Sequence, residues 1–385
     1  MAPHDGLERR VLTALDASPA RIPVILGGCG SGRTTLLHGL ADRLGRAACQ
    51  YVDLERAAST PERFYRAVTS SSPFLQAAPA VEPSSPREAF ERTLRLLTRM
   101  PGERAATFLL DEILELRTFE SFPGLRHVLR ETLDALAASG NRFVLTSRYV
   151  ARAHRVLRDA GARFEVIHLP SLSPTEVTAM LPPMGEVTAA DREFFGRTVQ
   201  ALTDGRAAYV RALGEASAAM STRAGDPISA LTALLTADGA LTAWCGYRYE
   251  LRLHRARGYG ALKAILEILA DDEPLTLTEI AQRLQRTPGS TKDYLSWLED
   301  VDLIVARQKR YSFADPLLRL WVRLHCRPVP PTPEDVVREV QHYAFARLPQ
   351  ASSVAVAAAV GHGAVVAYAG SEGEDRKGWG IIEID

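Results

Sequence analysis

Residues 24–35 read Val-Ile-Leu-Gly-Gly-Cys-Gly-Ser-Gly-Arg-Thr-Thr, and leucines follow at 36, 37 and 40. A short apolar run that ends in a glycine-rich loop and continues at helical spacing predicts a buried strand, a tight turn and a helix N-terminus. Glycines allow successive backbone N–H groups to turn inward, and the helix N-terminus adds the positive end of its dipole. The stretch therefore predicts an anion-binding loop built from backbone groups.

The spacing is that of a phosphate-binding P-loop, G-x-x-x-x-G-K-[ST], with Arg33 at the lysine position. We expect the nucleotide-binding residues to be Gly27, Gly28, Cys29, Gly30, Ser31, Gly32, Arg33, Thr34 and Thr35. The hydroxyl of Thr34 is also a candidate ligand of Mg²⁺. A guanidinium is wider and more planar than the compact ammonium of lysine, so the sequence supports binding better than fast hydrolysis. The alternative is a glycine-rich turn that binds nothing.

A second apolar run, residues 105–110, ends in Asp111 and Glu112. This pattern is typical of a Walker B strand, which carries its acids to the carboxyl edge of the sheet. We expect Asp111 to hold Mg²⁺ through water and Glu112 to act as the catalytic base that orients the attacking water. The alternative is an ordinary strand end, but the position after a P-loop, with a strand and helices between, favours the functional interpretation.

Three further segments read as strands: residues 48–53, 142–146 and 164–169. Strands that alternate with helices predict a parallel sheet with helices on both faces and its ligand at the carboxyl ends of the strands. The strand at 142–146 is followed by Ser147 and Arg148. We expect Arg148 to sense the terminal phosphate; the alternative is that it only begins a basic, solvated helix.

From Ser173 onward the sequence predicts helices. Gly205 and Arg206 lie between two of them, residues 190–202 and 207–220. Arg206, at a helix start, is a candidate second sensor of nucleotide phosphate; the alternative is a plain connection with a surface arginine. Residues 224–258 are interpreted as a connecting region without assigned chemistry.

Residues 259–325 predict three helices and a hairpin, the pattern of a winged helix-turn-helix. The candidate DNA contacts are Arg286, Lys292, Arg307, Lys309 and Arg310. Residues 259–325 contain nine Lys and Arg against ten Asp and Glu, which is unfavourable for a DNA-binding surface. Packing against protein is therefore the favoured alternative.

These motifs resemble, in family order, those of archaeal-type ATPases of the AAA+/STAND group. The resemblance covers about residues 20–325 and rests on residues 27–34, 111–112, 146–148 and Gly205. It implies an α/β core with an ASCE-type P-loop and a five-stranded parallel sheet flanked by helices, then a helical lid and a winged helix. It also implies ATP or ADP with Mg²⁺ between core and lid. Arg33 and Ala207, which replaces the lid proline, depart from the family pattern.

We expect four parts along the chain. They are a nucleotide-binding core (1–172), a helical lid and connector (173–258), the winged helix (259–327) and a tail with one helix and a small β-meander, an α+β segment (328–385). The leading hypothesis is an ATP- or ADP-binding conformational switch with slow hydrolysis. The alternative is a non-hydrolysing nucleotide-bound scaffold or a DNA-binding regulator.

The amino-acid composition limits the kinds of binding partner that we expect. The formal net charge is zero, so no global field attracts nucleic acid or membrane. The four cysteines are scattered and suggest neither a metal site nor a disulfide framework. With no apolar run of membrane-spanning length and no signal peptide pattern, we expect a cytoplasmic protein without a membrane partner. An arginine finger such as Arg152 or Arg155 would imply a homo-oligomer.

Overall fold

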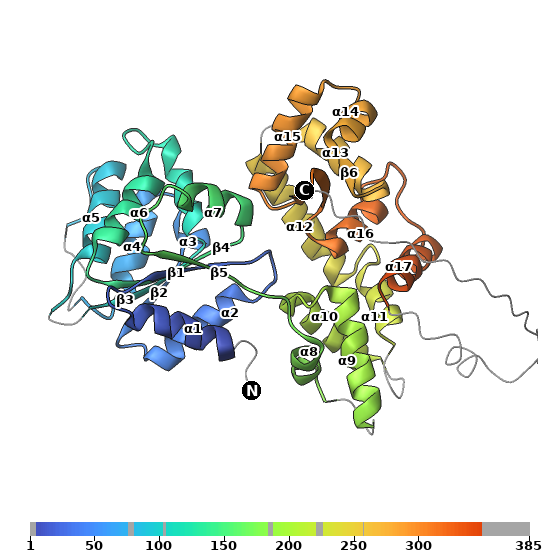
Figure 1. Ribbon diagram of the computed structural model, residues 1–385, viewed down its shortest axis with the longest axis horizontal. Coiled ribbons are helices and arrows are strands. Elements are labelled where there is room, and N and C mark those ends of the chain that lie inside the picture. Colours follow the sequence, from blue (N-terminus) through green and yellow to red (C-terminus); the bar gives the residue numbers. More distant parts are fainter. Residues whose placement is uncertain are drawn as a thin grey trace, which may run out of the picture. The chain divides into compact units, whose positions relative to one another are not determined.

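The computed structural model describes residues 5–75, 81–102, 105–183, 188–220, 226–256 and 258–348. All of them belong to one compact unit, residues 1–348 (Figure 1). The predicted β-meander of the tail lies outside the described residues.

Five parallel strands form the sheet of the core, in the order β2-β3-β4-β1-β5. They are β1 (Ile22–Leu26), β2 (Cys49–Asp53), β3 (Thr107–Asp111), β4 (Arg142–Ser147) and β5 (Phe164–His168). Strand β4 lies between the P-loop strand β1 and the acidic strand β3, as expected for an ASCE-type core. The predicted five-stranded parallel sheet is confirmed.

Helices cover both faces of this sheet (Figure 1). On one face lie α1 (Asp5–Asp16) and α2 (Arg33–Leu44). The other face carries α3 (Leu54–Ala57), α4 (Pro61–Ser70), α5 (Pro86–Thr98), η1 (Ile113–Ser121), α6 (Val128–Ala138) and α7 (Val150–Leu157). Successive strand residues point to opposite faces, so Ile25 packs toward α1 and α2 whereas Val24 and Leu26 join the other apolar cluster. Burial on both faces explains why the strands read as continuous apolar runs.

The second half of the chain is mainly helical. The lid and connector contain α8 (Pro174–Met180), α9 (Ala189–Thr203), α10 (Ala207–Ala219), α11 (Pro227–Leu234) and α12 (Ala240–Arg255). Helix α8 begins with a capping box in which the Ser173 side chain accepts from the Glu176 backbone, as the S-x-x-E spacing indicates.

The winged helix follows. It consists of α13 (Tyr259–Asp271), β6 (Leu275–Thr276), α14 (Leu277–Leu284), α15 (Pro288–Asp300), β7 (Ile304–Arg307) and β8 (Arg310–Phe313), followed by α16 (Pro316–His325). Strand β6 pairs with β8 and is too short to show a periodicity in the sequence. Helix α17 (Pro333–Arg347), predicted as part of the tail, buries Val336, Val340 and Ala344 in the apolar core that the lid, connector and winged helix share.

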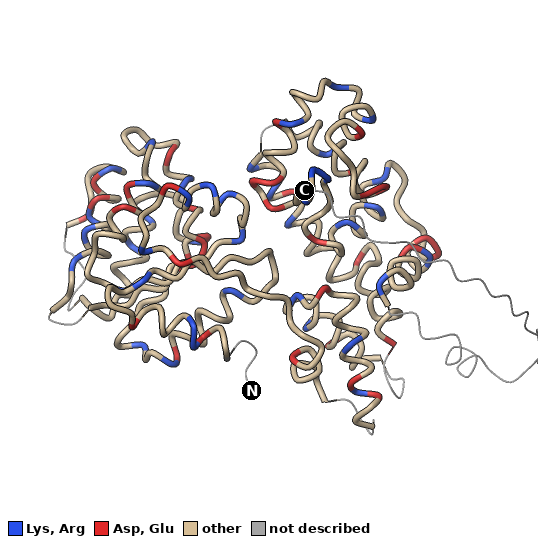
Figure 2. The backbone as a smooth tube through the Cα atoms, in the orientation of Figure 1, with Lys and Arg blue, Asp and Glu red and all other residues tan. Residues whose placement is uncertain are grey.

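Charges are mixed over the molecule. Figure 2 shows basic and acidic residues interspersed along both the core and the helical half, in keeping with a net charge of zero. In the ranges described above, no helix is long and apolar enough to cross a membrane.

Candidate functional site

The P-loop adopts a conformation that requires glycine. Gly30 and Gly32 have φ values of 77° and 101°, in the left-handed region. A β-carbon at Gly30 would lie 3.0 Å from the Trp244 ring and 3.1 Å from the β-carbon of Ala208. Helix α2 begins at Arg33, so the N–H groups of its first turn have no acceptor within the helix. The loop therefore combines inward-facing amides with a helix N-terminus.

A cavity of about 240 Å³ lies between this loop, the strand ends and the lid. Its lining comprises Cys29, Gly30, Ser31, Gly32, Arg33, Thr34, Thr35, Asp53, Glu55, Asp111, Glu112, Arg148, Ala207, Ala208, Arg211 and Arg248. Most of the nucleotide, metal and catalytic residues predicted from the sequence are thus brought together. Gly27, Gly28 and Arg206 are not part of the lining.

Thr34 and Asp111 lie side by side, as a Mg²⁺ site would require. The Thr34 hydroxyl donates to Asp111 Oδ2 at 2.7 Å, the Tyr51 hydroxyl donates to the same oxygen at 3.0 Å, and Thr146 donates to the other carboxylate oxygen. In the described chain no three His, Cys, Asp or Glu side chains gather into a cage for a metal. Mg²⁺ is usually held by one or two protein oxygens together with water and phosphate, and these residues fit that donor set.

Glu112 is buried and fixed in place. It has a φ of 59°, and its carboxylate lies 2.5 Å from Arg33 Nη2 and 3.3 Å from Arg148 Nε. The Arg148 backbone N–H donates to it at 3.0 Å. Burial alone would raise the pKa of Glu112, but Arg33 and Arg148 outweigh burial and hold the pKa below its usual value. The carboxylate is therefore ionised and paired with two cations.

The other terminal nitrogen of Arg33, Nη1, faces the P-loop. It donates to the Gly27 carbonyl, to the Gly28 carbonyl at 2.7 Å and to Ser31 Oγ at 3.4 Å. A planar fork can make these contacts and hold Glu112 at the same time, which a single ammonium cannot. Arg33 thus ties the P-loop to the predicted base.

Arg206 is engaged outside the cavity. Its Nη1 donates to the Cys29 carbonyl at 3.2 Å and lies 3.5 Å from Asp315, while its Nη2 donates to the Ala314 carbonyl. Its neighbour Ala208 approaches the loop directly, because the Ala208 N–H donates to the Gly30 carbonyl at 3.0 Å. The structure therefore places Arg206 as a link between the P-loop and the start of α16.

Sequence reasoning missed Arg248 and Arg211, which line the cavity from α12 and α10, and it missed Asp53 at the end of β2 and Glu55 in α3. Residues 224–258 are interpreted from the sequence as a connecting region without chemistry, yet α12 contributes Arg248 to the cavity lining. The spacing of Arg248, Arg252 and Arg255 places them on one face of α12, and this pattern in the sequence could have indicated a basic surface.

Around Cys29 the positive charge is dense. Burial would raise the pKa of the Cys29 thiol, but Arg252, Arg248, Arg148 and Arg33 together lower it below its usual value. A field that favours a thiolate also favours a phosphate oxygen.

The candidate DNA contacts lie apart from this cavity. Arg286, Lys292, Arg307, Lys309 and Arg310 are all exposed. Gln308 and Lys309, at the wing turn, have φ values of 50° and 62°. Arg155, nominated as an arginine finger, instead pairs with Asp300 of α15 in the same chain.

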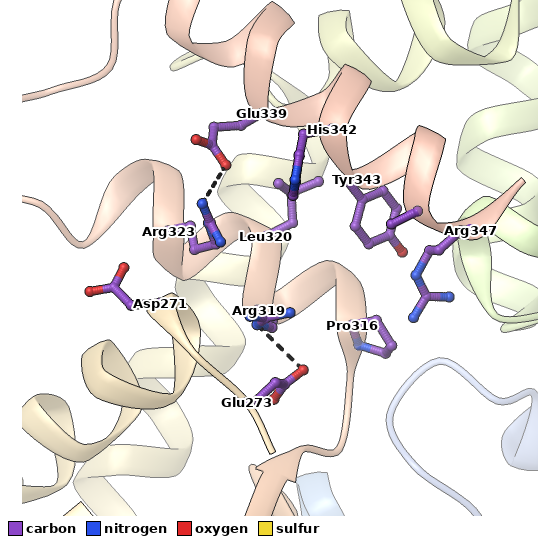
Figure 3. Close-up of a pocket in the computed structure, with 11 residues that line it drawn as sticks. Asp271, Glu273, Pro316, Arg319, Leu320, Arg323, Glu339, His342, Tyr343 and Arg347 are labelled. Carbon is purple, nitrogen blue, oxygen red and sulfur yellow. Dashed lines mark ion pairs between the residues drawn. The ribbon is translucent and has the colours of Figure 1, made fainter. Parts of the chain in front are cut away.

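A second cavity, of about 270 Å³, lies between α13, α16 and α17 (Figure 3). Two of its three arginines already have acidic partners: Arg319 lies 3.3 Å from Glu273 and Arg323 lies 3.0 Å from Glu339, as the dashed lines in Figure 3 show. No glycine is among the described residues that line it. We therefore place the candidate site at the P-loop.

Comparison with known proteins bears on the fold. A family model described as winged helix-turn-helix DNA-binding matches residues 261–305. No match is found among curated proteins.

Several solved structures are similar. A Walker-type ATPase of Pyrococcus abyssi has a TM-score of 0.61 at 18% identity, covering 84% of this chain and 96% of that one. The ORC1 protein of Aeropyrum pernix, solved in complex with DNA, has a TM-score of 0.45 at 17% identity, covering 90% and 95%. A STAND protein of Pyrococcus horikoshii has a TM-score of 0.30 at 17% identity, covering 89% and 45%. The strand order, the P-loop geometry and the first of these similarities together show that the chain has the fold of a Walker-type P-loop ATPase with a C-terminal winged helix.

Proposed function

We propose that this protein binds ATP or ADP with Mg²⁺ between core and lid and acts as a nucleotide-dependent conformational switch with slow hydrolysis. The observation that carries the proposal is the cavity in which P-loop amides, the Thr34–Asp111 pair and two lid-side arginines meet. Mg²⁺ bound there would neutralise charge on the transferring phosphate. Thr34 and Asp111 would hold it, and the amides of the loop and of the first turn of α2 would hold the phosphates.

Slow hydrolysis follows from the contacts of Glu112. A general base must accept a proton from water, and its efficiency falls as its pKa is lowered. Glu112 has a lowered pKa and is held by both Arg33 and Arg148. Glu112 must therefore exchange a guanidinium for the attacking water before it can act.

Several contacts that join the core to the helical half support a switch. Ala208 and Arg206 bind the P-loop, Arg255 binds Glu115 at 2.5 Å, and Arg155 binds Asp300. A ligand shifts a conformational equilibrium only when it binds one state better than the other. A nucleotide that touches both the loop and the lid meets that requirement.

The test combines binding with turnover. We expect titration calorimetry of the full chain to show binding of Mg-ATP and Mg-ADP, and Glu112→Gln to lower phosphate release about 10²-fold, the size of losing one preorganised catalytic contact. Glu91→Gln, at an exposed ion pair on α5, is the control and should match wild type. Absence of heat with both nucleotides in folded protein would contradict binding. Equal phosphate release by wild type and Glu112→Gln would contradict hydrolysis and leave the nucleotide-bound scaffold.

A DNA-binding regulator is the second candidate function. It is favoured by the family model over residues 261–305 and by exposed basic residues at the wing, Arg307 and Lys309, which have no ion-pair partner among the described residues. Fluorescence anisotropy with duplex DNA should then show binding that weakens with salt. The double variant Arg307→Ala, Lys309→Ala should reduce the salt slope, and the same affinity as wild type would exclude the wing as the contact.

A further inference from the structure

Helix α12 presents one aromatic and three basic side chains on a single face, here called the α12 stripe. Trp244, Arg248, Arg252 and Arg255 follow at helical spacing. At one end, the Trp244 ring would lie 3.0 Å from a β-carbon at Gly30. At the other, Arg255 Nη1 lies 2.5 Å from Glu115 and donates to the Tyr149 hydroxyl at 2.6 Å. The stripe therefore runs along the phosphate end of the candidate site.

Arg252, in the middle of the stripe, binds the winged helix. It is 4% exposed, and its Nη1 donates to the Asp302 carbonyl at 3.0 Å. Asp302 lies two residues after the end of α15, and its carboxylate would lie 3.4 Å from a β-carbon at Gly28. One helix thus contacts the P-loop and the winged helix through neighbouring side chains.

Arg248 is half-buried and, among the described residues, lacks the ion pairs that Arg33 and Arg148 have at the same cavity. Its Nη1 is buried without an acceptor, and no ion pair holds it within the described part of the chain. Its guanidinium lies 3.4 Å from the centre of the Trp244 ring, which fixes its plane. Arg33 and Arg148, by contrast, are both paired with Glu112.

This arrangement is costly without an anion. Burial lowers the pKa of Arg248, and a partly desolvated cation that contacts an aromatic ring but no anion destabilises the protein. A phosphate oxygen in the adjoining cavity would supply the missing acceptor, and a bidentate contact suits a guanidinium.

We infer that Arg248 binds the terminal phosphate of the nucleotide and lets the protein distinguish a triphosphate from a diphosphate. The inference rests on the proposed function, because it adds a residue to the same site. Arg248 lines the cavity that Glu112 and Arg148 line at the strand ends, where the terminal phosphate reacts. Arg206, expected in this role from the family resemblance, is engaged with Asp315 and the Ala314 carbonyl. Because Arg252 follows one turn later, α12 connects the phosphate with the winged helix.

The test uses the full chain and two probes, Mg-ATPγS and Mg-ADP, in titration calorimetry. Arg248→Ala should raise the Kd of Mg-ATPγS at least tenfold and change the Kd of Mg-ADP by less than twofold, while Arg248→Lys should recover part of the loss. Arg197→Ala, exposed on α9, is the matched control. Trp244 supplies a second readout, because its fluorescence should change with Mg-ATPγS and the change should disappear in Trp244→Phe.

The outcomes separate this inference from the proposed function. If wild type binds both nucleotides and Arg248→Ala binds Mg-ATPγS as tightly as wild type, the role of Arg248 is wrong and the proposed function stands. Equal weakening of both nucleotides also overturns it, because a general loss of structure or charge would act on both. If folded wild type binds neither nucleotide, the proposed function and this inference fall together.

Discussion

The two sides of the P-loop bury charge in different ways. On the core side Glu112 has two guanidinium partners, and Glu115 accepts from Arg255 and Tyr149. On the helical side Arg248 has a buried N–H without an acceptor, and no cation within the described ranges lies at ion-pair distance from the Asp302 carboxylate. The pKa values follow this contrast. Glu112 has a pKa below its usual value, whereas burial raises the pKa of Asp302 to about 6 despite Arg252, Arg206 and Arg33.

Glu112 and Asp302 are both buried, but only Glu112 lies at ion-pair distance from guanidinium groups of the described residues. Direct contact with a guanidinium, rather than burial, therefore decides which carboxyl has the lowered pKa. On the core side Arg33 and Arg148 therefore have a carboxylate partner without a ligand, while Arg248 on the helical side has none in the described part of the chain. We expect this difference if the core forms most of the phosphate-binding site and the helical half adds Arg248 when phosphate binds.

The largest expected effect is on the core side, at Asp111, the proposed Mg²⁺ ligand. Asp111→Asn should lower phosphate release about 10³-fold, equivalent to about 4 kcal/mol, because a metal supplies several kcal/mol of transition-state stabilisation. Phosphate release at saturating Mg-ATP measures it. Glu339→Gln, in the cavity of Figure 3, is the control and should leave the rate unchanged. A wild-type rate for Asp111→Asn would mean that the metal is held elsewhere.

Next in size is Glu115→Gln, which leaves Arg255 without its carboxylate and weakens the hold on Arg148. We expect the free energy of unfolding to fall by about 3 kcal/mol, the lower end for a broken buried pair, since Arg148 keeps Glu112 and Glu55. Urea denaturation measures it. Glu91→Gln, at an exposed pair, should cost less than about 1 kcal/mol. If both variants lose the same free energy of unfolding, the buried ion pairs of Glu115 stabilise the protein no more than an exposed pair does.

Asp302→Asn tests the helical side through pH. The folded protein keeps the Asp302 proton to about pH 6, whereas the unfolded chain releases it near 3.8. The folded state thus binds more protons between these values, so the free energy of unfolding falls as pH rises from about 4 to 6 and is level above. Removing the carboxyl should abolish this fall, which amounts to about 2–3 kcal/mol.

Denaturation in urea at several pH values measures this difference. Asp238→Asn, at an exposed acid, is the control and should keep the wild-type pH profile. A profile of Asp302→Asn parallel to that of wild type would show that Asp302 is already ionised in the folded protein at pH 4.

The smallest effect concerns Arg33, which joins the two sides. Arg33→Lys should raise phosphate release about tenfold, or about 1.4 kcal/mol, because a lysine can leave Glu112 free to orient water. Nucleotide Kd and the rate are measured together, since a change in Kd alone would reflect binding and not the release of Glu112. An unchanged rate would show that the Arg33–Glu112 contact does not limit turnover.

Much of the fold follows from local sequence. The apolar runs that end in Gly27 and Asp111 predict buried strands. Because both faces of such a parallel strand are buried, it can be identified from its own apolar sequence without knowing which strands pair with it. Caps such as Ser173 and Thr276 act within one turn, so the starts of α8 and α14 can be read from spacing alone. The P-loop motif likewise depends on backbone conformation that glycine permits locally.

Tertiary structure alone decided which charges meet. The sequence by itself determined the strands, the loop, the acids and the order of the parts, because these depend on short-range periodicity and steric preference. It could not show that Arg33 spans from Gly28 to Glu112, that Arg206 binds Asp315, or that Arg248 from a later helix enters the cavity. Such contacts join residues far apart in the chain, and their geometry exists only after the core and the helical half have packed.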